Sequence, residues 1–64
     1  MKFNEYDTVR TLNDCGEGIK KGDVGVVLVR FEEPHEAYEV EFVDSKGQPK
    51  AQCTLLPHEL EKAE

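Results

Sequence analysis

The sequence lacks a long hydrophobic run. Its longest unbroken stretch of aliphatic side chains is Val26 to Val29, whereas a membrane-spanning helix needs about 20 apolar residues. No apolar segment follows Lys2, so the first residues do not resemble a secretory signal peptide. We therefore expect a soluble, cytoplasmic protein that makes no contact with a membrane.

Positive charge is also scarce. The chain of 64 residues has 8 Lys and Arg residues against 14 Asp and Glu residues, which gives a formal net charge of −6. Proteins that bind nucleic acids usually present a basic face to the phosphates. The charge balance therefore argues against a nucleic-acid partner, although it leaves room for one small basic patch.

Cysteine is limited to Cys15 and Cys53. In the cytoplasm both are expected to be free thiols, although the count alone also permits one disulfide. His35 and His58 complete a set of two Cys and two His, but no two of these residues have the close spacing of paired zinc ligands. We expect no metal and no cofactor.

No set of residues predicts catalysis. Cys15 is flanked by Asp14 and Glu17, and acidic neighbours do not activate a thiol as a cation would. Glu39 and Glu41 lie two residues apart, which is the ordinary pattern of a solvated strand face. We therefore predict a protein that is not an enzyme.

Two segments have clear strand patterns. Residues 37–43 alternate strictly, so Tyr38, Val40 and Phe42 are predicted to point inward, with Glu39 and Glu41 pointing outward. Residues 24–31 are mostly apolar on both faces, which indicates a central strand. In this strand Gly25, Val27, Val29 and Phe31 share one face, and the side chains of Val27, Val29 and Phe31 are expected to lie in the core.

Two further strands are predicted at residues 7–12 and 48–55. In the first, Val9 and Leu12 are expected to point inward, which requires a local twist or bulge. In the second, Pro49 indicates an edge or strand-entry position. A helical turn is expected over residues 56–60, with Pro57 at its first position.

The connections are rich in turn residues. We expect a structural turn made by Gly22, Asp23 and Gly25 before the central strand, and a hairpin turn over residues 44–47 in which Gly47 has positive φ. Together these patterns predict an all-β fold: a small barrel of four to five antiparallel strands with a short C-terminal helical turn. One domain covers residues 1–64, with its core over about residues 6–60 and a polar tail over residues 61–64.

Residues 21–27, Lys-Gly-Asp-Val-Gly-Val-Val, resemble the turn and strand of SH3-like barrels of the KOW type. Over about residues 6–60 the chain is similar to a bacterial family of short stand-alone domains of unknown function with an SH3-like barrel related to KOW domains and nitrile hydratase components. The segments that carry this resemblance are residues 7–10 (Asp-Thr-Val-Arg), 21–27, 37–42 (Ala-Tyr-Glu-Val-Glu-Phe) and 44–47 (Asp-Ser-Lys-Gly). It implies a partner-binding or antitoxin-like role beside a neighbouring gene product, and it supplies no catalytic residue.

The region between residues 31 and 45 has six acidic residues and neither Lys nor Arg. We interpret these acids as a protein-interaction face for a basic partner encoded by an adjacent gene, while solubility and protection of sheet edges are the alternative explanation. They are Glu32, Glu33, Glu36, Glu39, Glu41 and Asp44.

Two other functions stay open, and so does homo-oligomerisation. KOW-like nucleic-acid binding would require Arg10, Lys20, Lys21 and Arg30 to cluster on one face. An accessory role beside a metalloenzyme such as a nitrile hydratase-like complex follows only from the resemblance, because the Cys and His spacing does not support a metal site.

Overall fold

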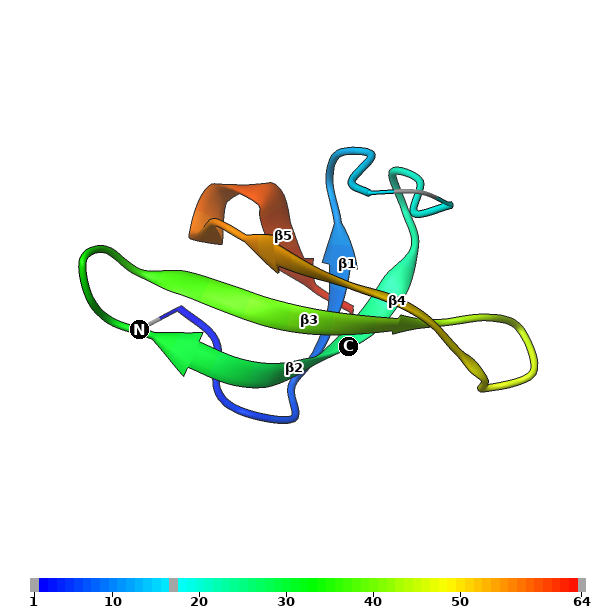
Figure 1. Cartoon of the computed structure of the whole chain (residues 1–64), viewed down its shortest axis with the longest axis horizontal. Helices are drawn as coiled ribbons and strands as arrows, with labels where there is room; N and C mark the ends of the chain where they lie inside the picture. The colour runs from blue at the N-terminus through cyan, green and yellow to red at the C-terminus, as the bar shows by residue number, and fades with distance from the viewer. Residues whose placement is uncertain (1, 17, 64) are drawn as a thin grey trace.

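The computed structural model describes residues 2–16 and 18–63 as five strands and one short 3₁₀ turn (Figure 1). The elements in chain order are β1 (Thr8–Thr11), β2 (Val24–Phe31), β3 (Ala37–Val43), β4 (Pro49–Leu55), η1 (Pro57–Glu59) and β5 (Leu60–Lys62). The predicted all-β fold of antiparallel strands with a C-terminal helical turn is confirmed, and the bounds of β2 and β3 are those that the sequence predicts.

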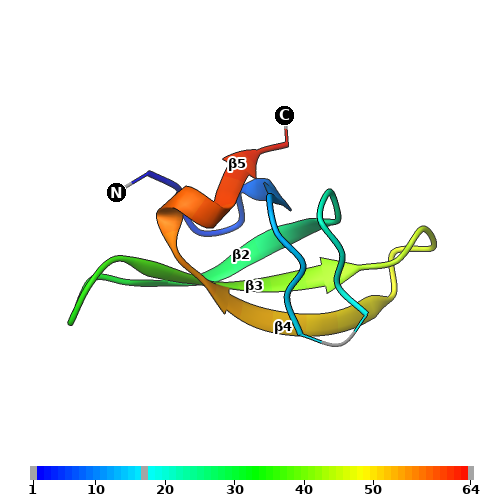
Figure 2. The same cartoon turned by 90° about the horizontal axis from the view of Figure 1, so that it is seen from above.

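All neighbouring strands are antiparallel, in the order β4-β3-β2-β1-β5. Strands β2, β3 and β4 form one layer, and the short pair of β1 and β5 crosses over it (Figures 1 and 2). The chain passes from the layer to the crossing pair through η1. Strand β4 is at the end of the strand order and begins at Pro49, so the predicted edge or strand-entry position of Pro49 is confirmed.

The core lies between the layer and the crossing pair. Tyr38, Val40 and Phe42 of β3 are fully buried, which confirms the inward face that the alternation predicts. Each such side chain contributes about 1.5–3 kcal/mol when it leaves water. The other buried apolar members of the core cluster are Phe3, Val9, Ile19, Val27, Leu55 and Leu60.

A β-bulge divides β2 into two halves, and the side chains that follow the period of two from Val27 change to the other face of the sheet after the bulge. Val27 lies opposite Val40, but Val29 lies opposite Glu39, so Leu28 is an extra residue in β2. Val29 and Phe31 are therefore turned to the outside and are 39% and 38% exposed. The prediction that these two side chains build the core with Val27 was wrong, because a strict period of two cannot pass through a bulge.

The end of β1 also differs from the sequence prediction. β1 ends at Thr11, and Thr11 is fully buried whereas Leu12 is half-buried. The Thr11 hydroxyl donates to the Asn13 carbonyl over 2.7 Å, so this buried polar group has a partner. The inward residue after Val9 is thus Thr11, in simple alternation, and the expected inward position of Leu12 was wrong.

The first two residues of the predicted polar tail form part of a strand. Glu61 and Lys62 belong to β5 and lie opposite Arg10 and Val9 of β1. The Arg10 guanidinium and the Glu61 carboxylate are 3.1 Å apart on the exposed side of this pair. Residue 64 lies outside the described residues. At the other end Phe3 is buried, so the core extends further toward the N-terminus than residue 6.

The glycines before and in β2 have different roles. Gly22 has φ of 97°, which favours glycine, and the Asp23 carboxylate accepts the Lys20 N–H over 3.0 Å. Gly25 was expected to belong to the turn, but it lies within β2. A Cβ added to Gly25 would lie 2.6 Å from the Glu41 carbonyl oxygen. Gly47 has φ of 81° in the β3–β4 turn, as predicted.

In the described part of the chain, no helix has the length and apolar character needed to cross a membrane.

Candidate functional site

The six acidic residues singled out in the sequence occupy three places in the fold. Glu32, Glu33 and Glu36 lie in the connection between β2 and β3, and Asp44 lies at the opposite end of β3. Glu39 and Glu41 lie between them on β3. The acids therefore follow one strand and its two ends, and their bonding differs from place to place.

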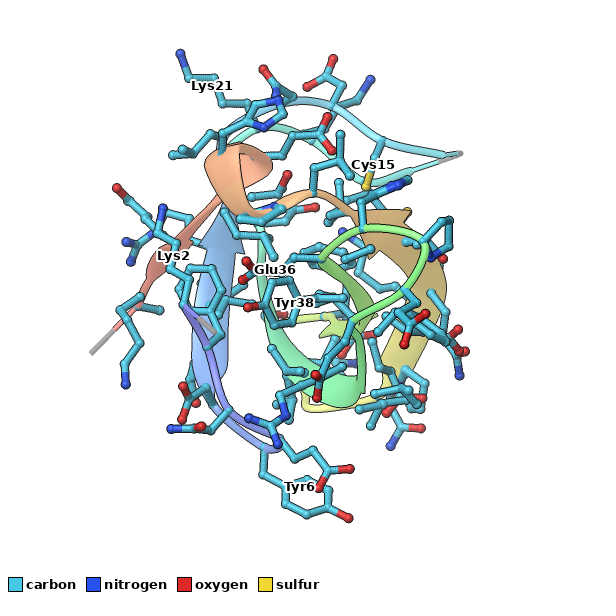
Figure 3. The ribbon with its side chains drawn as sticks, turned by 90° about the vertical axis from the view of Figure 1, so that its left-hand side faces the viewer. Lys2, Tyr6, Cys15, Lys21, Glu36 and Tyr38 are labelled. Carbon is cyan, nitrogen blue, oxygen red and sulfur yellow. The ribbon has the colours of Figure 1, made fainter. Side chains whose placement is uncertain are left out.

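Glu36 is bonded within the domain. Its Oε2 accepts the backbone N–H of Lys2 over 3.0 Å and the hydroxyl of Tyr38. These contacts, first the Lys2 N–H and then the Tyr38 hydroxyl, lower the pKa of the Glu36 carboxyl. Figure 3 shows Glu36 beside Tyr38, with Lys2 on the neighbouring N-terminal segment. Glu36 thus fixes this segment to β3, and its carboxylate is engaged within the domain.

Tyr38 is the buried partner in this network. Its hydroxyl accepts the Phe3 N–H over 3.1 Å, and the two rings form an edge-to-face pair with centroids 5.2 Å apart. Burial, and then the hydrogen bond with Glu36, raise the pKa of Tyr38. The Lys2 ammonium donates to the Pro57 carbonyl over 3.2 Å and so links the same segment to η1. These contacts attach the N-terminal segment to β3 and η1, and we call the cluster of Lys2, Phe3, Glu36 and Tyr38 the N-terminal clasp.

Asp44 is also occupied locally. Its Oδ1 accepts the N–H groups of Lys46 and Gln48 over 2.8 Å and 2.9 Å, and its carbonyl accepts the Gly47 N–H. Such bonds from an Asp side chain to the backbone ahead of it define a turn. Asp44 therefore shapes the β3–β4 hairpin.

Glu39 and Glu41 point to the outside of the β2–β3–β4 layer, as predicted. Glu39 lies opposite Val29 on one side and Thr54 on the other, and Glu41 lies opposite Val26 and Gln52. Both glutamates are half-buried between these neighbours. We call the surface that these side chains share with Phe31 and Ala37 the outer face; its residues are Val26, Val29, Phe31, Ala37, Glu39, Glu41, Gln52 and Thr54.

The outer face has an apolar part that the sequence analysis missed. Phe31 lies opposite Ala37, and Val29 lies beside it opposite Glu39. Ala37 is only 7% exposed and lies outside the core cluster. The connection after Phe31 adds the exposed acids Glu32 and Glu33. The result is an exposed aromatic and aliphatic pair with carboxylates beside it.

The four basic residues considered for nucleic-acid binding do not gather. Lys20 and Lys21 precede the start of β2, while Arg30 lies near its end, and a strand of this length spans about 25 Å. Arg30 donates to the Asn4 side chain over 3.2 Å, and Arg10 pairs with Glu61 on the crossing strands. Arg30 is thus separated from Lys20 and Lys21 by the length of β2.

The two thiols, in contrast, come together. Cys15 lies in the loop between β1 and β2, and Cys53 lies on β4 opposite Val40. Both pack against the core and are half-buried. Burial, and then the neighbouring Cys53 sulfur, raise the pKa of Cys15 to about 12. A thiol with so high a pKa is a weak nucleophile at neutral pH.

Residues 2–16 and 18–63 have no surface pocket and no group of three or more Cys, His, Asp or Glu side chains placed to bind a metal ion. The features that the described structure offers for function are therefore the outer face and the pair of thiols.

The chain belongs to the family described as Domain of unknown function (DUF4926), whose family model matches residues 5–62. No curated protein matches the chain significantly, and neither does any solved structure. The sequence-based expectation of a family of domains of unknown function is confirmed, and the match extends over β1 to β5.

Proposed function

We propose that this DUF4926 domain is a non-enzymatic protein-interaction module that binds a basic partner through its outer face. The observation that carries the proposal is the exposure of Phe31 and Val29 on a sheet face that also presents Glu39. Protein interfaces commonly combine an aromatic or aliphatic centre with a polar rim. The outer face has both parts on one rigid layer of three strands.

Charge supports a basic partner. Glu32 and Glu33 follow Phe31 directly, and Glu39 and Glu41 extend the negative charge along β3. Carboxylates placed around an apolar contact speed the approach of a positively charged protein and disfavour acidic competitors. The net charge of −6 acts in the same direction over longer distances.

The resemblance to SH3-like barrels of a bacterial family supplies the finer part of the proposal. A three-stranded layer followed by a short helical turn and a last strand that pairs with β1 agrees with such a barrel. On this basis we propose an antitoxin-like or accessory role, with the product of an adjacent gene as the partner, in the cytoplasm. KOW-like nucleic-acid binding has less support, since the four basic residues are spread over the fold.

The test is co-expression with the products of adjacent genes, followed by affinity purification at low salt. We expect a stable complex that the double variant Glu39→Lys/Glu41→Lys and the variant Phe31→Ser each weaken at least about tenfold, which corresponds to about 1.4 kcal/mol of binding free energy. Glu61→Lys, which reverses a charge on the crossing strand β5, serves as the control and should retain the affinity.

Two results would overturn the proposal. One is a complex that survives both outer-face changes without loss of affinity. The other is salt-dependent binding of RNA or single-stranded DNA, measured by fluorescence anisotropy, in the absence of any protein partner; that outcome would support the KOW-like alternative.

A further inference from the structure

The fold brings together the cysteines Cys15 and Cys53, which are far apart in the sequence. Cys15 is held in its loop by a backbone hydrogen bond from its N–H to the Ile19 carbonyl over 3.0 Å, and Ile19 is itself a buried core residue. Cys53 is fixed in β4 by its pairing with Val40. Figure 3 shows the Cys15 side chain turned from the loop toward the body of the domain, where Cys53 also packs against the core and is its neighbour.

The loop backbone lies directly on the Cys53 sulfur. A Cβ added to Gly16, the residue after Cys15, would lie 3.2 Å from the Cys53 Sγ. The absence of a side chain at Gly16 therefore lets the loop approach β4 closely. Gly16 is also exposed and has φ of 56°, a conformation that glycine adopts without strain. The loop that carries Cys15 thus lies close to the Cys53 sulfur.

We propose that Cys15 and Cys53 form a reversible intramolecular disulfide, with a small-molecule disulfide such as oxidised glutathione as the oxidant. This proposal is independent of the outer face. It assigns a modification site to a protein whose cysteines are otherwise ordinary free thiols, and it makes the attachment of the β1–β2 loop to β4 dependent on redox conditions.

The exchange proceeds in two balanced steps. The thiolate of one cysteine attacks a sulfur of the small disulfide, forms a mixed disulfide and releases one small thiolate. The second cysteine then loses its proton, attacks the protein sulfur of the mixed disulfide and releases the second small thiolate. The two protein thiols lose two protons and two electrons, and the small disulfide is reduced to two thiols.

The disulfide would close a long segment of the chain. It would join the loop before β2 to the edge strand β4, and so connect two parts that the sheet itself does not pair. Cross-links over long segments restrict the unfolded chain most. We expect the oxidised protein to have a Tm higher by about 10 °C or more than the reduced protein.

The experiment treats the folded, reduced protein with oxidised glutathione and then follows mass, free thiols and Tm. The expected product is a monomer that has lost two hydrogens and both free thiols and melts at a higher temperature, and dithiothreitol should reverse all three changes. The variants Cys15→Ser and Cys53→Ser should each stop at the mixed disulfide with glutathione, with little gain in Tm.

Two findings would refute the inference. The first is that the folded wild type yields only glutathione adducts or linked dimers, while the same protein in urea forms the internal disulfide. The second is an internal disulfide that lowers the Tm, since that would show that the native positions of the two sulfurs oppose the bond. The double variant Cys15→Ser/Cys53→Ser is the control, and its Tm should not respond to the oxidant.

Discussion

Val29 lies opposite Glu39 in the sheet, although Val27, two residues earlier in β2, lies opposite Val40. The intervening Leu28 takes up one extra position, so the side chains of the second half of β2 change faces. Val27 is fully buried in the core, whereas Val29 is exposed on the outer face beside a carboxylate. This single bulge creates the apolar part of the proposed interface.

The bulge predicts different costs for the same substitution at two neighbouring positions. Val27→Ala should lower the free energy of unfolding by about 2–3 kcal/mol, because it leaves a cavity in a packed core. Val29→Ala should change it by less than about 1 kcal/mol, because its side chain is already in contact with water. Urea denaturation of both variants measures the difference. Equal losses would mean that β2 alternates without a bulge.

Gly25 should tolerate no side chain. An alanine Cβ there would lie 2.6 Å from the Glu41 carbonyl oxygen and 2.8 Å from the Val40 Cγ1, so the paired strands would have to move apart. We expect Gly25→Ala to lower the free energy of unfolding by about 1–3 kcal/mol and Gly25→Asn to lower it further. Thermal denaturation followed by circular dichroism provides the measurement.

Gly22 is the matched control for Gly25, because its constraint is conformational and not steric. Its surroundings are open, but its φ of 97° is costly for alanine. Asn enters the left-handed region more readily than Ala. At Gly22 the Asn variant should therefore be the more stable of the two, the reverse of the order at Gly25. The same order at both positions would contradict the close approach of β2 and β3.

Tyr38→Phe should destabilise the N-terminal clasp. The change removes the hydroxyl that accepts the Phe3 N–H and donates to Glu36, while it keeps the ring that packs on Phe3. A buried N–H without a partner costs about 1–3 kcal/mol. Chemical denaturation should show this loss, and hydrogen exchange at the Phe3 amide should accelerate. Tyr6→Phe, at a side chain that is 74% exposed, should have little effect.

The regular parts of the fold could be predicted from the sequence because they rest on local patterns. The inward set on β3 follows from a period of two, and the turn at Gly47 follows from the residue types around it. The bulge at Leu28 could not be predicted, because it depends on how strands far apart in the sequence bend over one core. The inward Thr11 follows simple alternation with Val9 and was missed because Leu12 is the apolar residue there. The strand pairing of Glu61 and Lys62 likewise has no signal in a polar segment.

The candidate site likewise has features that could be predicted from the sequence and features that could not. The outward direction of Glu39 and Glu41 was predictable, while the separate bonding of Glu36 was not, since its partner Lys2 is at the other end of the domain. Similarly, the spacing of Cys15 and Cys53 indicates no pair. Only the path of the loop across β4 brings the residue next to Cys15 onto the Cys53 sulfur.

The stability of the domain should fall in acid, and Glu36 should contribute to that fall. The pKa of Glu36 is lower in the folded protein than its ordinary value of 4.5, because the Lys2 N–H and the Tyr38 hydroxyl bind the carboxylate. The folded state thus prefers the ionised form. The resulting stabilisation is present above pH 4.5 and is lost as the pH falls through the lower, folded-state pKa.

Glu36→Gln and Asp23→Asn test this dependence as a pair. The pKa of Asp23 is lowered from 3.8 by the Lys20 N–H and then by Lys50, so the same reasoning applies over a lower pH range. At neutral pH each variant should be less stable than the wild type, because the amide loses the charge-assisted bonds. On acidification the difference should shrink, from about pH 4.5 for Glu36→Gln and from about pH 3.8 for Asp23→Asn. Urea denaturation over a pH series measures both differences, and a difference for Glu36→Gln that stays constant into acid would show that its carboxylate has no preferential role in the folded state.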